Sequence, residues 1–142
     1  MKFIKTEFLF LLTILFFSSC AQKAQENINV SSDKMIIRIS EIEIDPNYLD
    51  EYISILKEEA EASVRLEKGV VSIYPMLQKE KPNEIRILEI YADKYAYEAH
   101  LQTPHFKHYK TTTLEMVKAL KLIDMEAIDG ETMPKIFTKL RQ

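Results

Sequence analysis

All three histidines of this 142-residue chain lie within a stretch of nine residues. His100, His105 and His108 follow an alternating, strand-like segment that ends with Glu89 and Tyr91. Imidazole is the side chain whose unperturbed pKa lies nearest neutral pH, and a neighbouring carboxylate can exchange protons with it or hold it in place. The chemistry that these residue types indicate is proton transfer at the junction of a strand and a helix.

Glu89 and Tyr91 are expected on one face of their strand together with Ile85 and Ile87, because strand side chains alternate. A carboxylate on an apolar face is costly to bury without a partner. Two interpretations stay open. Glu89 is either exposed near the strand end or paired with a cation such as Arg86, or it is a pocket acid or base whose pKa is raised by desolvation.

The three histidines are expected to have different roles. His100 ends a predicted helical segment, where it either caps the helix or acts as a general base or hydrogen-bond donor. His105 and Tyr109 are four residues apart and share a helix face. His108 points elsewhere, toward solvent. We therefore predict His100 and His105 as pocket residues and leave His108 out.

A metal site built from these histidines is the sharpest alternative. Ligand pairs of the HxxxH type need one continuous helix, and Thr103-Pro104 separates His100 from His105. His105 and His108 could still chelate an ion with a third ligand from the strand. The interrupted spacing favours the interpretation without metal, so we predict no metal ligands.

The hydropathy pattern predicts the order strand, helix, strand, strand, helix, strand after residue 34. Asp45-Pro46 provides a helix start, and Gly69 lies just beyond that helix. The tail contains the apolar pair Ile136-Phe137, which needs a packing partner. The predicted strands are residues 35–44, 70–78, 85–91 and 120–128, and the second helical stretch is 93–119 with a break at Thr103-Pro104.

This order predicts a ferredoxin-like α+β fold, in which two helices cover one face of a four-stranded antiparallel sheet. The strand at 35–44 is apolar on both faces, so the uncovered face also needs a partner. We expect a homodimer in which two sheets close into a dimeric α+β barrel. A small-molecule pocket is expected between the two sheets.

The first 33 residues differ from the rest. Lys2 and Lys5 precede the apolar run Phe8–Phe17, which is typical of a signal peptide and too short to be a convincing spanning helix. The segment ending in Cys20 resembles a bacterial lipobox, which implies acylation of Cys20; an ordinary signal peptide is the alternative. We predict a signal peptide at 1–19, a tether at 20–33 and one domain at 34–142.

Ala21, rather than an aspartate, follows the predicted acylation site. By resemblance to lipoprotein sorting, this favours a location in the cell envelope, anchored by lipid on the periplasmic side of the outer membrane. The lipid anchor is the only membrane contact expected. The net charge of −3 is too small to indicate nucleic acid as a partner. Two glycines and no GxGxxG or P-loop pattern argue against a phosphate cradle.

The stretch Glu89–Tyr109 resembles the signature of the antibiotic biosynthesis monooxygenase (ABM) domains, and residues 69–74 resemble the second strand of that family. The similarity extends over about residues 35–127 and is greatest to the branch of quinol monooxygenases and of a relative that processes phosphorylated autoinducer-2. It implies a dimeric barrel that oxidises quinol-like or aromatic substrates with O₂, without metal, flavin or other cofactor. The asparagine and tryptophan that some members use, and that heme-degrading relatives need, are not evident.

The resemblance also implies site roles. His100 corresponds to the motif histidine and would be the catalytic base or an anion stabiliser, with Glu89 as a second catalytic residue that orients the substrate. The substrate-binding residues would be Tyr74, Tyr91, His105 and Tyr109. Three alternatives stay open: a small-molecule-binding envelope lipoprotein without turnover, an isomerase of an autoinducer-like molecule, and a structural envelope protein.

Overall fold

The structure, a computed structural model, describes residues 34–139. Four strands form one sheet in the order β2-β3-β1-β4, and every neighbouring pair is antiparallel. The strands are β1 (Ile36–Ile44), β2 (Val70–Leu77), β3 (Glu84–Tyr91) and β4 (Val117–Met125). The predicted ferredoxin-like α+β fold is confirmed. The predicted signal peptide, the tether and Cys20 lie outside the described residues.

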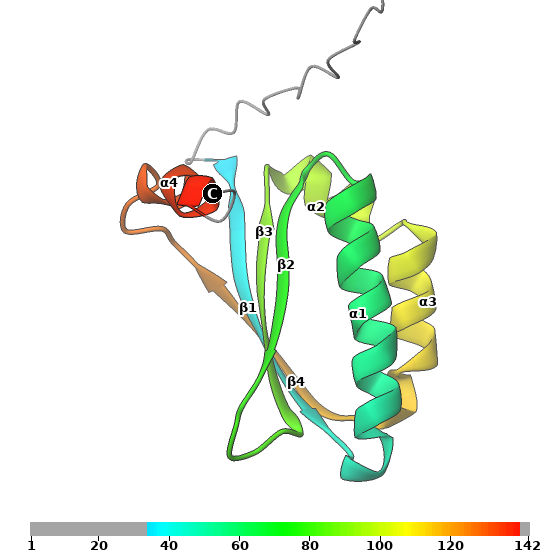
Figure 1. Cartoon of the computed structure of the whole chain (residues 1–142). Coiled ribbons are helices and arrows are strands. Elements are labelled where there is room, and N and C mark those ends of the chain that lie inside the picture. Colours follow the sequence, from blue (N-terminus) through cyan, green and yellow to red (C-terminus); the bar gives the residue numbers. More distant parts are fainter. Residues whose placement is uncertain (1–33, 140–142) are drawn as a thin grey trace, which may run out of the picture.

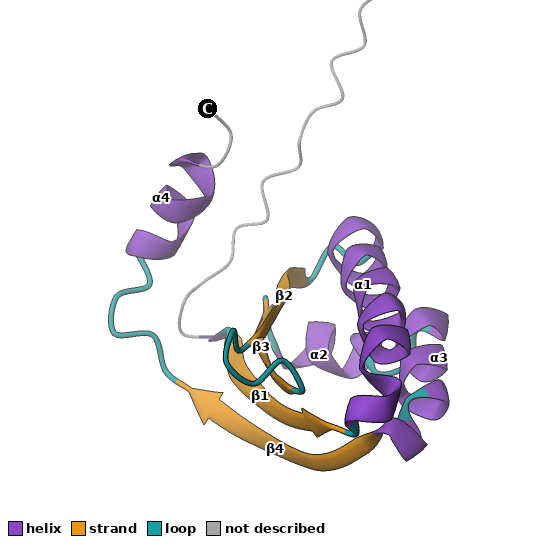
Figure 2. Ribbon diagram, turned by 60° about the horizontal axis from the view of Figure 1, so that its bottom comes forward, coloured by secondary structure: helices purple, strands orange, loops and turns teal. Residues whose placement is uncertain are grey.

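Three helices lie on the same face of the sheet (Figures 1 and 2), and a fourth follows β4 and stands apart from them. The helices are α1 (Leu49–Leu66), α2 (Lys94–His100), α3 (Pro104–Thr112) and α4 (Thr132–Lys139), and short 3₁₀ turns η2 (Pro46–Tyr48) and η3 (Leu114–Met116) precede α1 and β4. Within residues 34–139, no helix combines the length and apolar character needed to cross a membrane.

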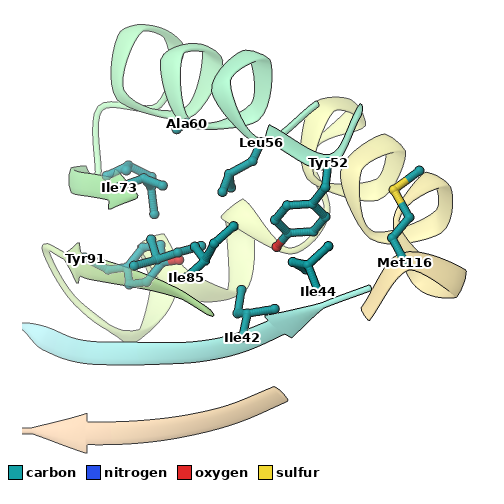
Figure 3. Packing of buried hydrophobic residues seen from close by; sticks show 11 residues of the cluster. Ile42, Ile44, Tyr52, Leu56, Ala60, Ile73, Ile85, Tyr91 and Met116 are labelled. Carbon is teal, nitrogen blue, oxygen red and sulfur yellow. The ribbon is translucent and has the colours of Figure 1, made fainter. Parts of the chain in front are cut away.

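The predicted cap at Asp45 is present, but it starts the 3₁₀ turn η2, and α1 begins only at Leu49. The Asp45 carboxylate accepts a hydrogen bond from the Asn47 amide at 2.9 Å, which caps the turn that leads into α1. Tyr52 and Leu56 then follow at helical spacing and are buried against Ile44 and Ile85 of the sheet (Figure 3). Burial of this stripe holds α1 across β1, β3 and β2.

Gly69 joins α1 to β2, but not as the left-handed helix terminator that its position suggests. No glycine in the described chain has a positive φ. A Cβ at Gly69 would instead overlap the Cβ of Ala96 in α2. The Gly69 carbonyl also accepts a hydrogen bond from the Ala92 amide at 2.8 Å. The glycine is therefore needed for the close approach of α2, the helix that carries His100.

The second helical stretch ends earlier than predicted, so that the predictions of helix to Ala119 and of a strand from Leu120 are wrong. Helix α3 ends at Thr112, and β4 already begins at Val117. Thr111 and Thr113 each donate a side-chain hydrogen bond at 2.8 Å to the carbonyl four residues earlier. Such bonds of β-branched residues weaken a helix, and a run of three threonines ends this one.

The face of the sheet opposite α1, α2 and α3 is apolar toward the start of β1 and charged toward its end, where Glu41 pairs with Arg86. Ile37 and Ile39 of β1 lie beside Leu88 of β3 and Met125 of β4, and Tyr74 of β2 pairs with Leu88. Tyr74 is 60% exposed and Met125 is 50% exposed in the single chain. This face, called the outer face below, is the one that the sequence analysis predicts to need a partner.

The tail after Gly130 forms α4, which the sequence analysis does not predict. Ile136 is 54% exposed there, so the predicted packing of this residue is not met within the described chain.

Candidate active site

A cavity of about 250 Å³ lies between the sheet and the helices. Its apolar walls are Ile42, Ile73, Ile87, Leu101, Phe106, Leu120 and Leu122, and its polar side chains are Arg38, Ser40, Glu59, Glu89, Tyr91, Tyr97, His100, Tyr109 and Lys110. It lies on the helix-covered face, within one chain, and not at the outer face where the sequence analysis expects a pocket between two sheets. The helices leave the β4 side of this face partly uncovered, because Leu120 and Leu122 of β4 stay more than half exposed. This uncovered side leaves room for the cavity.

Glu89 lies on the cavity wall and is held by two hydroxyl groups. Ser40 of β1 donates to its Oε1 atom, and Tyr91 donates to its Oε2 atom at 3.0 Å. These donors, and not Arg86, compensate the carboxylate for its partial burial. A carboxylate offers about four acceptor positions, so two remain for a hydroxyl group in the cavity. Glu89 can therefore orient a substrate hydroxyl.

His100 lies at the end of α2 and is 2% exposed. Its Nδ1 atom lies 3.0 Å from Oε1 of Glu67, the residue that follows α1. An ionised carboxylate only accepts hydrogen bonds, so this contact places the imidazole hydrogen on Nδ1. The lone pair of neutral His100 is then on Nε2. This is the arrangement of a general base whose tautomer is fixed by a carboxylate.

His105 lies behind His100 and does not line the cavity. Its Nε2 atom is 2.6 Å from the same Oε1 atom of Glu67 that contacts His100. The expectation that His105 touches substrate is therefore not met in the single chain. His108 is exposed, as predicted, with its Nδ1 atom 3.4 Å from the Thr112 hydroxyl.

A second buried carboxylate, Glu59 of α1, faces His100 from the other side. Its Oε1 atom lies 3.7 Å from Nε2 of His100 and accepts a hydrogen bond from Ser63 at 2.8 Å. Burial raises the pKa of Glu59, partly offset by the bond from Ser63 and by the nearby imidazoles. Glu59 is thus a second proton-binding group on the cavity wall.

Three buried tyrosines lie at or next to the cavity: Tyr91 and Tyr109 line it, and Tyr52 contacts Tyr109. The hydroxyls of Tyr52 and Tyr109 are 2.6 Å apart, and that of Tyr91 bonds to Glu89. Burial raises the pKa of Tyr109 to about 12. Burial, together with the nearby charges, raises the pKa of Tyr52 and of Tyr91 further. All three phenols stay protonated at neutral pH, so they act as hydrogen-bond donors and not as bases.

One end of the cavity carries an ion pair between β1 and β4. Arg38 forms an ion pair with Asp124 at 2.7 Å and donates to the Tyr97 hydroxyl at 3.0 Å. The guanidinium carbon of Arg38 also lies 4.9 Å from the centre of the Tyr97 ring. This arrangement holds a guanidinium, paired with Asp124, on the cavity wall, where a substrate oxyanion would meet it.

Two aromatic rings pack against His100 at the cavity wall. The ring centre of His100 lies 4.7 Å from that of Phe106 and 5.3 Å from that of Tyr91. Tyr74, in contrast, does not line this cavity. Ile73 pairs with Glu89 on the helix-covered face, so the next residue of β2 points to the outer face. Of the six predicted pocket residues, His100, Glu89, Tyr91 and Tyr109 are brought together there.

Sequence reasoning missed Glu59 and Glu67. Both lie on the buried stripe of α1 or on its extension, seven and fifteen residues after Tyr52. A carboxylate at a position where the helical spacing requires an apolar residue is the signal that could have found Glu59. Glu67, Ser63 and Glu59 together form a polar end to an otherwise apolar stripe.

Fold and cavity define a class of protein: a ferredoxin-like α+β domain with a small cavity in which a carboxylate-bound imidazole faces hydroxyl and carboxylate groups. The model of one family, Antibiotic biosynthesis monooxygenase, matches residues 35–112. The chain belongs to this family. No curated protein matches the chain.

Solved structures agree with this assignment. A structure from Bacteroides thetaiotaomicron assigned to the antibiotic biosynthesis monooxygenases is 50% identical, with a TM-score of 0.69, over 70% of this chain and 94% of that one. A protein from Lactobacillus acidophilus assigned as a monooxygenase is 28% identical, with a TM-score of 0.63, over 65% of this chain and only 44% of its own. A structure from Caulobacter crescentus shares the fold at 20% identity, with a TM-score of 0.63, over 68% of this chain and 92% of that one.

Proposed function

We propose that this protein is a cofactor-independent monooxygenase of the quinol monooxygenase branch, which oxidises a small hydroxylated aromatic compound with O₂. The observation that carries the proposal is the fixed tautomer of His100. Glu67 holds the Nδ1 hydrogen, so Nε2 is the basic atom of a residue on the cavity wall. The cavity of about 250 Å³ is small among ligand pockets, which favours a substrate of one or two rings.

The reaction balances without an external reductant. His100 removes the hydroxyl proton, and the resulting arenolate gives electrons to O₂ as a bond forms between a ring carbon and oxygen. Protonation gives a hydroperoxide. Loss of the hydrogen on that ring carbon as a proton, with cleavage of the O–O bond, leaves a carbonyl and releases hydroxide, which becomes water. One hydroxynaphthalene and one O₂ would thus give one naphthoquinone and one water.

The other cavity residues assist this proton removal. Glu89 has free acceptor positions for a substrate hydroxyl, and the charge of Arg38 stabilises the arenolate. When Glu59 is ionised, its charge lies 3.7 Å from Nε2 of His100 and stabilises the imidazolium that forms there.

Oxygen uptake with a hydroxynaphthalene tests the proposal. The wild-type chain should consume O₂ above the uncatalysed rate and place one labelled atom from ¹⁸O₂ in the quinone. His100→Ala should lower the turnover at least about 100-fold, the usual contribution of a general base. His108→Ala is the matched control, because this exposed histidine of α3 lies away from the cavity.

Two results would contradict the proposal. Uptake that stays at the uncatalysed rate for a set of hydroxylated one- and two-ring compounds would argue against an oxygenase. If a compound raises the melting temperature without uptake, the alternative of a binding protein without turnover is supported instead. Uptake that His100→Ala leaves unchanged would remove His100 from the mechanism.

We further propose that the chain is a homodimer and a lipid-anchored envelope protein. The apolar outer face supports the dimer. The order of Lys2, Lys5, the apolar run and Cys20 supports the anchor. Mass spectrometry of the N-terminal peptide should find acylated Cys20 as the first residue, and Cys20→Ala should move the protein out of the membrane fraction. An unmodified Cys20 within an uncleaved chain would contradict the anchor.

A further inference from the structure

We infer that Glu67, His100 and His105 bind one divalent transition-metal ion, at a site behind the cavity. Each residue offers one ligand atom, and these three atoms all lie within 4.8 Å of one another. They come from three separate element ends: the residue after α1, the last residue of α2 and the second residue of α3. Two imidazoles and one carboxylate form a ligand set that first-row transition metals use.

The spacing of the ligand atoms fits one ion. Oε1 of Glu67 lies 3.0 Å from Nδ1 of His100 and 2.6 Å from Nε2 of His105. Bonds of about 2.1 Å from a metal to each ligand place neighbouring ligand atoms about 3 Å apart in an octahedral shell and slightly further apart in a tetrahedral one. Outward movement of the His105 side chain by a few tenths of an ångström would meet this spacing. His105 is only partly buried, at 17% side-chain exposure, so it has room to move.

The surroundings of His100 provide a second observation. A histidine that binds metal through one nitrogen usually donates its other N–H to a carboxylate. With Nδ1 of His100 on the metal, its Nε2–H faces Oε1 of Glu59 at 3.7 Å. Glu59 is itself oriented by the hydroxyl of Ser63 at 2.8 Å. The buried polar end of α1 thus places a carboxylate close to the nitrogen whose hydrogen a metal-binding histidine donates, and a shift of a few tenths of an ångström would complete the bond.

The ligand set also says which ions the site would take. Two nitrogens and one carboxylate oxygen suit Zn²⁺, Co²⁺ or Fe²⁺ better than Ca²⁺ or Mg²⁺, which prefer oxygen ligands. Three protein ligands leave further positions of the ion for water. Since Nδ1 gives up its hydrogen to bind metal, Nε2 then carries one. The ion would therefore convert His100 from a hydrogen-bond acceptor into a donor toward the cavity. Metal-bound His100 could not act as the base of the proposed oxygenase, so the ion would switch that activity off.

Competition between the full-length chain and a fluorescent chelator for Zn²⁺ tests this site in the absence of any aromatic substrate. The wild-type chain should bind Zn²⁺ with a specific affinity that Glu67→Gln and His105→Ala each lower by more than 10-fold. Loss of an outer partner alone costs about 10- to 100-fold. His108→Ala, the matched control on α3, should bind as the wild type does. All chains compared carry Cys20→Ala, so that the single thiol of the chain cannot bind Zn²⁺ in this measurement.

Nitrogen NMR of the wild-type imidazoles gives a readout that needs no variant. Zn²⁺ should shift Nδ1 of His100 and Nε2 of His105 and leave His108 unchanged. Equal Zn²⁺ affinity of wild type, Glu67→Gln and His105→Ala would overturn the site, as would the absence of these shifts. Because no step uses oxygen or an aromatic compound, this failure is distinct from failure of the oxygenase proposal.

Discussion

The hydroxyl groups of Tyr52 and Tyr109 lie 2.6 Å apart and join α1 to α3 beneath the cavity. Both rings are packed edge to face, with centres 5.9 Å apart. The contact links the buried stripe of the long helix to the helix that carries His105. Because neither phenol ionises easily in the folded state, the stability of the fold depends on pH in the alkaline range.

The first prediction is a loss of stability above pH 10 that depends on Tyr109. An unfolded tyrosine has a pKa of about 10, whereas burial raises that of folded Tyr109 to about 12. Between these values the unfolded state binds fewer protons than the folded state. The contribution of Tyr109 to the free energy of unfolding is therefore fully present below pH 10 and is lost as the pH rises through about 12. Tyr52 and Tyr91, whose pKa values burial also raises, add to the fall.

Urea unfolding at pH 9 to 12 measures this effect. Tyr109→Phe should reduce the slope of stability against pH by up to about 1.4 kcal/mol per pH unit, the value for one proton. Tyr95→Phe, at an 80% exposed site in α2, is the control and should keep the wild-type slope. Equal slopes for wild type and Tyr109→Phe would show that Tyr109 ionises in the folded state as easily as in the unfolded state.

The second prediction concerns the close approach of Gly69 and Ala96. Gly69→Ala should destabilise the fold by about 1–3 kcal/mol, because the added Cβ overlaps that of Ala96. Ala96→Gly should cost about 1 kcal/mol through helix propensity. The double variant should lose less than the sum of the two, since the smaller residue in α2 relieves the overlap. Urea unfolding of the three variants measures this coupling, and additive losses would show that the two positions do not meet.

The third prediction, which depends on the proposed function, separates positioning from binding at Glu67. Glu67→Gln should lower the turnover with a hydroxynaphthalene about 100-fold and change KM little, because an amide no longer fixes the tautomer of His100. Glu61→Gln, an exposed position one and a half turns earlier, is the control. A purely structural role of Glu67 would lower the melting temperature and leave the turnover of the folded fraction unchanged.

The sequence predicts the first three strands within one residue at each end, since alternation is strong there, and it places α1 correctly but starts it at Pro46, where the structure has a 3₁₀ turn. It fails at the end of α3, where three threonines fit a helix by hydropathy but bond to the preceding turn. His100, Glu89, Tyr91 and Tyr109 are predicted site residues that meet at one cavity. They lie in one continuous stretch, so local spacing was enough to group them.

Glu67 could not be found in the same way. It lies 33 residues before His100, and the two meet only because Gly69 allows α2 to pack against the start of β2. Tyr74 shows the opposite case. The alternation of β2 predicts that it opposes Ile73, but the sequence does not say which of two apolar faces the helices cover. Both cases depend on tertiary arrangement and not on local structure.

The last prediction tests the homodimer through the outer face. Ile39 of β1 and Tyr74 of β2 lie on this face, on either side of β3, and a stable interface of ordinary size buries about 800 Å² on each partner. Tyr74→Asp places a charge in the proposed contact, where it would have no partner. Because Tyr74 is 60% exposed in the single chain, this change should leave the folded subunit intact.

Sedimentation equilibrium at micromolar concentration should therefore find a dimer for the wild-type chain and a monomer for Tyr74→Asp, with unchanged circular dichroism. Ser54→Asp introduces the same charge at an exposed position of α1 and should remain dimeric. A shift of the dissociation constant by at least 100-fold is expected, since an unpaired buried charge costs about 3–5 kcal/mol. If Tyr74→Asp stays dimeric while Ser54→Asp dissociates, the subunits meet through the helices, and the outer face needs another partner.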